Sequence, residues 1–344
     1  DHRYSAVQAR KAPAFQSTSR ASPGNSHSER QARIGAAMIT VWQGSVNTWD
    51  CDEMGHMNVR VYVEKAQEGL GALAHALDLP RAFHADGYST LLPTDQHIRF
   101  LKEALPGAAL GMQACILEIG ESDALVYQEM RHSNGDIAAA FRTRLRHAEV
   151  RSGRAFPWSE RTLSALERLK GRAPKSAAPR SIDPAEPVKP ANQCTVSVAD
   201  AAGAKTIGRG MVPPAHLDTH GRMSPQWIMG RLSDSVPFLL ADWRSRVAEA
   251  SGGVRMGGAV LEYRLLYHHW PTAGDLFEVR TSLARVEKKF HSLVHWVLDP
   301  VTGLPWATTE AVAVTLDIDA RKIIPTPKPL MDELAVIAPG GLSI

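Results

Sequence analysis

The sequence has few cysteines and no long apolar run, and both absences exclude classes of protein. Its three cysteines, Cys51, Cys115 and Cys194, lie far apart and form no C-x-x-C pair. Neither a disulfide framework nor a zinc ribbon is therefore expected. A reducing compartment, the cytoplasm, fits this usage best. No stretch approaches 18 uninterrupted apolar residues, which predicts that no segment spans a membrane.

An excess of one charge is also lacking. Lys and Arg number 39 against 36 for Asp and Glu, and six basic residues but only two acids precede Met38. The rest of the chain is therefore close to neutral and gives no electrostatic reason to expect a nucleic-acid partner. The apolar fraction of 44% and the charged fraction of 22% are those of an ordinary globular protein.

The length of 344 residues exceeds the usual size of one hydrophobic core, so two domains are predicted. Residues 1–37 nearly lack large aliphatic side chains, which predicts a disordered tail. Met38 is then a candidate start. An organellar transit peptide is the alternative, because the tail is basic and poor in acids.

A proline-rich stretch separates the two predicted domains. Residues 151–192 contain six prolines and are predicted to be a linker, with one short amphipathic piece at 158–169. The predicted domains are therefore residues 38–150 and residues 193–330, with a C-terminal tail at 331–344.

Hydrophobic periodicity predicts the same order of elements in both domains. The first has a strand at 41–46, a long helix at 58–77, and strands at 92–105, 111–122, 125–133 and 137–147. The second has a strand region at 193–210, a helix at 225–250, and strands at 258–270, 276–286, 290–298 and 306–316. The two glycine pairs at 252–253 and 257–258 are expected to form a flexible turn before a strand, because no phosphate-loop pattern surrounds them.

A short motif recurs at the start of both predicted helices. Three residues have a counterpart 166 positions later: Asp52 with Asp218, Gly55 with Gly221, and Met57 with Met223. Together with the shared order of elements, this spacing indicates an internal duplication.

The motif has a physical reading of its own. A carboxylate just before a helix, followed by a glycine that permits a tight turn, lies beside the free N–H groups of the first helical turn. The helix N-terminus polarises a carbonyl and stabilises an oxyanion, while the carboxylate activates water or attacks directly. Asp52 and Gly55, ahead of the helix at 58–77, fit this pattern. An Asp in this place is otherwise an ordinary helix cap.

The segment from Asp52 to Asn58, D-E-M-G-H-M-N, followed by Tyr62, resembles the D-x-x-G-H-x-N-x-x-x-Y signature of 4-hydroxybenzoyl-CoA thioesterase-like hotdog proteins. The resemblance covers residues 38–149. It implies an α+β fold class with two tandem hotdog folds, each a long central helix wrapped by an antiparallel β-sheet. It also implies an acyl-CoA thioesterase that releases free acid and CoA and uses neither a metal nor another cofactor.

The resemblance also assigns residues. Asp52 would be the catalytic base or nucleophile, with His56 and Asn58 lining the thioester, and the backbone N–H groups around Asn58 and Val59 would polarise its carbonyl. Tyr62 would pack under the helix. The expected catalytic residues are Asp52, His56 and Asn58, and the expected substrate-binding residues are Gly55, Val59, Arg222 and Asp218.

The second copy of the motif departs from the signature. Arg222 replaces the histidine and Ser224 the asparagine. We expect this half to supply walls for the site around Asp52, with Arg222 meeting a phosphate or carboxylate. A structural arginine is the plainer reading.

Two other functions remain open. A non-catalytic acyl-CoA binding or sensing module would explain the eroded second motif, and a hotdog enoyl-thioester hydratase would normally show a D-x-N-P-x-H motif, which the sequence lacks. No G-x-S-x-G elbow is present, which excludes the α/β-hydrolase route. His291 and His295 have no third ligand at metal-site spacing and are expected to be structural. Association of double-hotdog chains into a homo-oligomer also remains open.

Overall fold

The computed structural model describes residues 38–344, and the tail predicted at 1–37 lies outside the described residues. Within the described range, none of the helices is both long enough and apolar enough to cross a bilayer.

The first half follows the predicted order of elements. β1 (Ile39–Ser45) leads through a short 3-10 turn into α2 (Val59–Ala76). The meander that follows consists of β2 (Ser89–Phe100), β3 (Ala109–Ile119), β4 (Asp123–His132) and β5 (Ile137–Glu149). The helix begins at an Asn58 cap, whose side chain accepts the N–H of Arg60, and it buries one stripe of apolar residues against the sheet.

The second half repeats this order with β6 (Lys205–Met211), α5 (Pro225–Ala250), β7 (Met256–Tyr267), β8 (Leu276–Val286), β9 (His291–Leu298) and β10 (Pro305–Asp317). A short β11 (Lys322–Ile323) pairs with β10. The strand predicted at 193–210 is wrong in its first part. There α4 (Val196–Ala201) forms instead, because the Thr195 hydroxyl caps its first turn by accepting the N–H of Val198.

The two glycine pairs after α5 have different conformations. Gly252 and Gly253 have φ values of +88° and +74° and form the expected turn. Gly257 and Gly258, predicted as part of a turn, lie inside β7 and pair with Leu316 and Thr315 of β10. The side chains of Met54 and Ile318 pack closely over Gly257, and that of Arg244 packs closely over Gly258.

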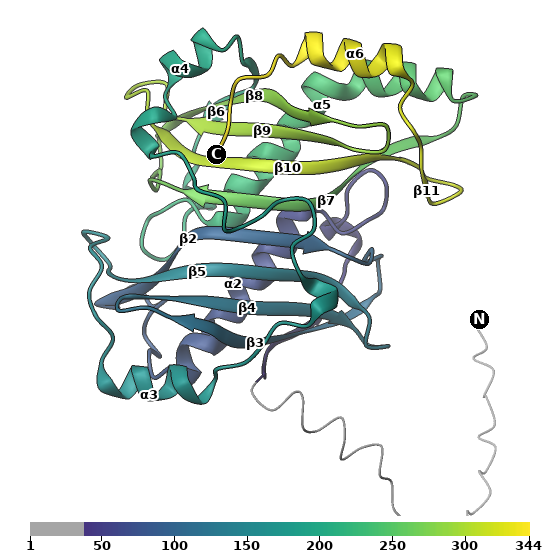
Figure 1. Cartoon of the computed structure of the whole chain (residues 1–344). Coiled ribbons are helices and arrows are strands. Elements are labelled where there is room, and N and C mark those ends of the chain that lie inside the picture. Colours follow the sequence, from purple (N-terminus) through teal and green to yellow (C-terminus); the bar gives the residue numbers. More distant parts are fainter. Residues whose placement is uncertain (1–37) are drawn as a thin grey trace, which may run out of the picture. The chain divides into compact units, whose positions relative to one another are not determined.

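The segments outside the two halves are folded against them. The linker contains α3 (Glu160–Arg168), which confirms the amphipathic piece predicted there. Its later residues run across the outer face of the sheet (Figure 1). α6 (Lys328–Ile337) crosses the predicted boundary at residue 330. Leu334 and Leu342 are buried, so residues 331–344 are part of the packed structure.

All strands belong to one sheet, in the order β1-β3-β4-β5-β2-β7-β10-β9-β8-β6. The halves join where β2 and β7 pair antiparallel, from Asp95 opposite Leu266 to Arg99 opposite Glu262. Both long helices lie on the same face of this sheet (Figure 1). Each helix is wrapped by the strands of its own half, so the predicted tandem hotdog fold is confirmed.

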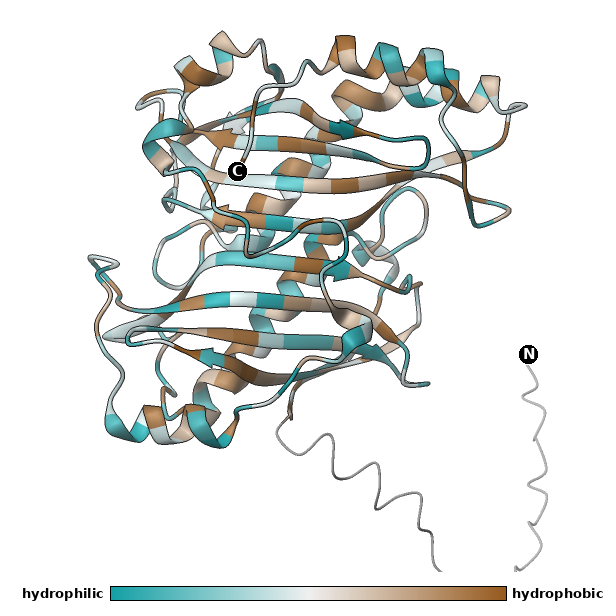
Figure 2. Cartoon of the chain, viewed as in Figure 1, coloured by the Kyte–Doolittle hydropathy of each residue, from teal (hydrophilic) through white to brown (hydrophobic). Residues whose placement is uncertain are grey.

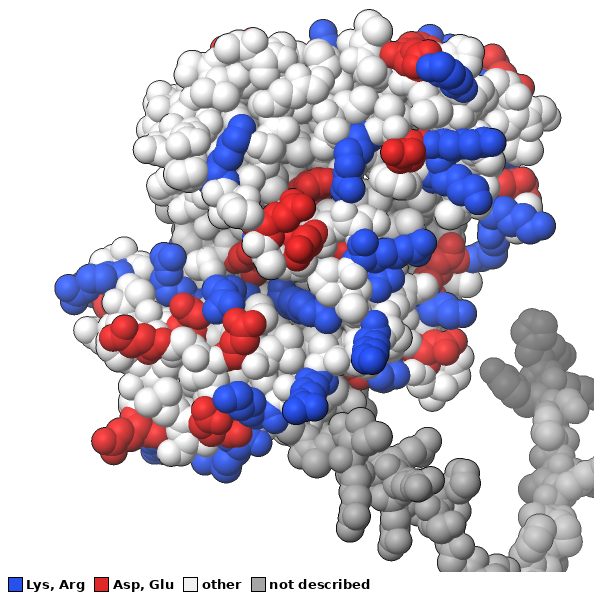
Figure 3. Space-filling model, in the orientation of Figure 1, with Lys and Arg blue, Asp and Glu red and all other residues white. Residues whose placement is uncertain are grey.

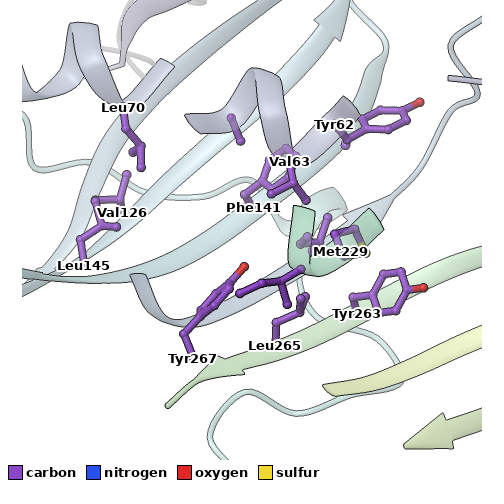
Figure 4. Packing of buried hydrophobic residues seen from close by; sticks show 14 of the residues in the cluster. Tyr62, Val63, Leu70, Val126, Phe141, Leu145, Met229, Tyr263, Leu265 and Tyr267 are labelled. Atoms are coloured by element: carbon purple, nitrogen blue, oxygen red, sulfur yellow. The ribbon is translucent and has the colours of Figure 1, made fainter. Parts of the chain in front are cut away.

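One hydrophobic cluster runs through both halves and holds the helices on the sheet. The strands alternate hydrophobic and hydrophilic residues (Figure 2), as expected where one face is covered. Leu70, Val126 and Phe141 from the first half belong to the same cluster as Met229 and Leu265 from the second (Figure 4). Fully burying each such side chain contributes about 1.5–3 kcal/mol.

Candidate active site

The turn before α2 fixes the carboxylate of Asp52. The N–H of Asp52 donates to the carbonyl of His56 (2.8 Å), and Gly55 closes the turn at a φ of +75°. Oδ1 of Asp52 accepts the N–H groups of Met54 (3.0 Å) and His56 (3.1 Å). Oδ2 makes no hydrogen bond with any described residue, so it remains free to act on a ligand.

The first turn of α2 leaves one backbone donor free. The N–H of Asn58 donates to the carbonyl of Asp50 (2.8 Å), and that of Val61 donates to the carbonyl of Asn58 (2.8 Å). Oδ1 of Asn58 accepts the N–H of Arg60 at 2.9 Å. The N–H of Val59 has no partner among the described residues. Of the two donors expected from the sequence, Val59 is therefore the one with its N–H free.

His56 lies where the two halves meet. Its Nε2 is 3.6 Å from Oε2 of Glu103. Glu103 also forms an ion pair with Arg321, which lies between β10 and β11 in the second half. Arg321 of the second half is thereby connected to His56 of the motif through Glu103.

A cavity of about 600 Å³ opens beside these groups and is lined by both halves. It contains Asp52, His56, Asn58 and Val59, whereas Gly55 shapes the turn without lining the cavity. The first half also contributes Tyr62 and Phe100, and the second contributes Ser233, Pro237, Arg244, Gly258, Tyr263 and Val314.

Three aromatic rings form one wall. Tyr62 and Phe100 meet edge to face with ring centroids 5.1 Å apart, and Phe100 meets Tyr263 in the same way at 6.4 Å. Figure 4 shows Tyr62 and Tyr263 on the same side of the core cluster. Burial raises the pKa of both phenols, so they stay protonated. The wall is thus apolar with neutral polar tips, which suits an acyl chain.

The sequence reasoning missed the wall that α5 supplies. Pro237 has no N–H, so the carbonyl of Ser233 receives no bond from the next helical turn, and both residues line the cavity. Arg244 lies against Gly258 on the same side. A proline inside a helical pattern and two adjacent glycines in a strand pattern were the available signals.

The second copy of the motif has the same turn in different surroundings. Oδ1 of Asp218 accepts the N–H groups of His220 (2.8 Å) and Arg222 (3.0 Å), and Gly221 has a φ of +77°. Neither Asp218 nor Arg222 lines the cavity. The guanidinium of Arg222 donates to the carbonyl of Val150, so this turn packs against the first half. Substrate contact by Asp218 and Arg222 stays a prediction.

Residues 46–166 match the family model of the thioesterase-like superfamily, whereas no curated protein matches the chain. Among solved structures, the chain is similar to a putative oleoyl thioesterase from Lactobacillus plantarum, at 12% identity and a TM-score of 0.61, covering 84% of this chain and 98% of that one. An acyl-ACP thioesterase from Bacteroides thetaiotaomicron has 10% identity and a TM-score of 0.58, with 80% and 98% covered. A 12:0-ACP thioesterase from Umbellularia californica has 10% and 0.57, with 83% and 96% covered. At these identities the likeness shows the fold. The described residues therefore have a tandem hotdog fold, and the first half is similar to the thioesterase-like superfamily.

Proposed function

We propose that this protein hydrolyses an acyl thioester to a free acid and a thiol, with acyl-CoA as the substrate. One observation carries the proposal: one carboxylate oxygen of Asp52 and the N–H of Val59, neither with a partner in residues 38–344, belong to residues that line the same cavity. A nucleophile or base and an oxyanion donor are the two groups that thioester hydrolysis needs.

In the proposed reaction the thioester carbonyl lies against the N–H of Val59, at the positive end of the α2 dipole. Asp52 either removes a proton from water as that water attacks the carbonyl carbon, or attacks the carbon itself. In the first route the C–S bond breaks and the thiolate takes up the proton that Asp52 removed. In the second the C–S bond breaks as the anhydride forms, and water then cleaves the anhydride and supplies the proton that the thiolate takes up. His56 and Asn58 border this space, and Asn58 holds the helix start in place through its cap.

The acyl group would lie along the aromatic wall of Tyr62, Phe100 and Tyr263, where burial of apolar surface favours it by roughly 25 cal/mol per Å². The narrower kinship with 4-hydroxybenzoyl-CoA thioesterase-like proteins stays part of this proposal. Two of the similar structures are thioesterases of acyl-ACP, so an acyl carrier protein is a second candidate for the thiol. The proposed compartment is the cytoplasm, since Cys115 and Cys194 are buried free thiols.

The test compares the same substitution at equivalent positions of the two halves. Asp52→Asn and Asp218→Asn each alter a carboxylate whose Oδ1 accepts two backbone N–H groups of its own turn, but only Asp52 lines the cavity. With acyl-CoA and acyl-ACP of graded chain length, we expect Asp52→Asn to lower thiol release by about 10²- to 10⁴-fold. Asp218→Asn should retain most of it.

Two results would contradict the proposal. Equal loss of activity in both variants would mean that the aspartates act through the fold alone. Tight binding of acyl-CoA with no thiol released by the unaltered protein would instead identify a sensing module, the alternative that the eroded second motif favours.

A further inference from the structure

Arg244 is a charged side chain in an otherwise largely apolar part of the cavity. It belongs to the last turns of α5, which continues for eight residues beyond the position equivalent to the end of α2. Its side chain is partly buried and lines the cavity together with Val236, Val260 and Tyr263. The extension of α5 therefore places a cation where the first half has no counterpart.

The guanidinium of Arg244 forms no hydrogen bond or ion pair with any residue in the part of the chain that the structure describes. Neighbouring arginines do have partners: Arg246, two positions later on the same helix, pairs with Glu333, and Arg255 pairs with Asp319. Partial burial without a partner leaves this cation free to bind an anion that enters the cavity. Glu53 and the neutral, buried His291 interact electrostatically with Arg244, but neither forms a hydrogen bond or ion pair with it.

The strand below is shaped to receive this side chain. A Cβ at position 258 would lie 2.5 Å from Nη2 and 2.7 Å from Cζ of Arg244. The guanidinium therefore occupies the space over β7 that a side chain at position 258 would fill. A Cβ on the adjacent Gly257, which would point to the other face of the strand, would meet Sδ of Met54. Arg244 and the turn that contains Asp52 and Met54 line the same cavity.

We propose that Arg244 binds an anionic group of the substrate, a carboxylate or a phosphate, and so selects which thioesters enter the site. The planar guanidinium offers a fork of donors that matches the paired oxygens of either group. The anion would come either from the far end of a dicarboxylic acyl chain or from the phosphate of a pantetheine arm. The inference rests on the proposed function in treating the ligand as a substrate, but binding of the anion requires no turnover.

The test measures affinity with four non-hydrolysable probes, so that binding and catalysis are separated. The probes are S-(2-oxoalkyl)-pantetheine thioethers whose chain ends in a methyl group or a carboxylate, each with or without a 4′-phosphate. Calorimetric titrations compare the full chain with Arg244→Met and Arg244→Lys. Arg246→Met is the control, since it removes a guanidinium from the same helix outside the cavity.

We expect the unaltered protein to prefer one of the two charged groups by about 10- to 100-fold, the range for a hydrogen bond to a charged partner. Arg244→Met should abolish that preference and leave the uncharged probe unchanged, while Arg244→Lys should retain part of it. A preference that follows the chain carboxylate identifies a dicarboxylic acyl substrate, and one that follows the phosphate identifies the carrier arm.

Equal affinity of the unaltered protein for all four probes would overturn the inference, even if Arg244→Met failed to fold. Equal weakening by Arg244→Met and Arg246→Met would overturn it as well. Anion-selective binding without thioester hydrolysis would instead retain the role of Arg244 and refute the proposed function.

Discussion

Nε2 of His97 lies 2.7 Å from Oε1 of Glu262, across the strand pair that joins the two halves. Both side chains are nearly inaccessible, at 1% and 2% exposure. The same carboxylate accepts the N–H groups of Arg180 (2.9 Å) and Ser181 (2.8 Å) from the linker. One buried charge therefore connects the first half, the second half and the linker.

The repeat provides a second pair at the equivalent positions. Arg264 and Asp95, each 167 positions from His97 and Glu262 respectively, form an ion pair at 2.9 Å. Arg264 also donates to the linker carbonyls of Asp183 and Glu186. On the outer face of the sheet, charges of both signs are intermixed over this region (Figure 3). The linker thus closes the junction by satisfying charges from both halves.

Glu262→Gln should destabilise the protein by about 3 kcal/mol or more at neutral pH, because it leaves a buried network without its charge. Burial raises the pKa of Glu262, but the bonds from His97, Arg180 and Ser181 outweigh it and hold the pKa below its usual range. The stabilisation is therefore complete above the ordinary pKa and is lost as pH falls through the lowered one. Urea unfolding should show that the difference in unfolding free energy between the unaltered protein and Glu262→Gln is smaller in acid than at pH 7. The exposed pair of Glu118 and Arg144 gives the control, since Glu118→Gln should cost less than about 1 kcal/mol.

His295→Gln should flatten the dependence of stability on pH. Burial holds the pKa of His295 and of His291 at about 4, below the ordinary value of about 6.5. Between those pH values the imidazole is protonated in the unfolded chain but not in the folded chain. The free energy of unfolding therefore has its full value above about pH 6.5 and falls toward pH 4, by up to about 3 kcal/mol for each imidazole. The equivalent position of the first half already holds a glutamine, Gln128. An unchanged slope in His295→Gln would contradict this, and His84→Gln, at an exposed site, is the control.

Gly258→Ala should weaken the anion preference without unfolding the protein. The added methyl group would strike the end of a flexible side chain, the guanidinium of Arg244, which moves at little cost in stability. We expect about a tenfold loss of preference for the anionic probe and a nearly unchanged melting temperature. Gly257→Ala is the matched variant, because its methyl group meets Met54 and Ile318. Equal loss of preference in both variants would speak against a specific contact with Arg244.

Gly55→Ala and Gly221→Ala should cost similar stability but differ in activity. Both glycines have φ near +75° and open space where a Cβ would lie, so the cost is the backbone strain of roughly 1–2 kcal/mol. Only the turn at Gly55 holds two N–H groups on the carboxylate of Asp52. Chemical denaturation and thiol release measured on both variants separate the two effects, and parallel losses of activity would count against the role of this turn.

The sequence alone determined the local structure and one half of the candidate site. Alternation and helical periodicity depend on residues a few positions apart, which is why the helices at 59–76 and 225–250 and the meanders were predicted close to their observed bounds. The motif from Asp52 to Asn58 is likewise largely local, since the hydrogen bonds of its turn and cap lie within eight residues, except that the N–H of Met57 donates to the carbonyl of Ala104. The helix at 196–201 was missed because a short capped turn has no periodicity to show.

Only the tertiary structure decided which distant residues meet. The pairing of β2 with β7 places Tyr263 beside Phe100, and the extra turns of α5 place Arg244 over Gly258. It also places the two equivalent turns in different surroundings: Asp52 lines a cavity, whereas the turn of Asp218 packs against the first half through Arg222. Such contacts depend on how two folded surfaces fit together, and no short stretch of sequence contains both partners.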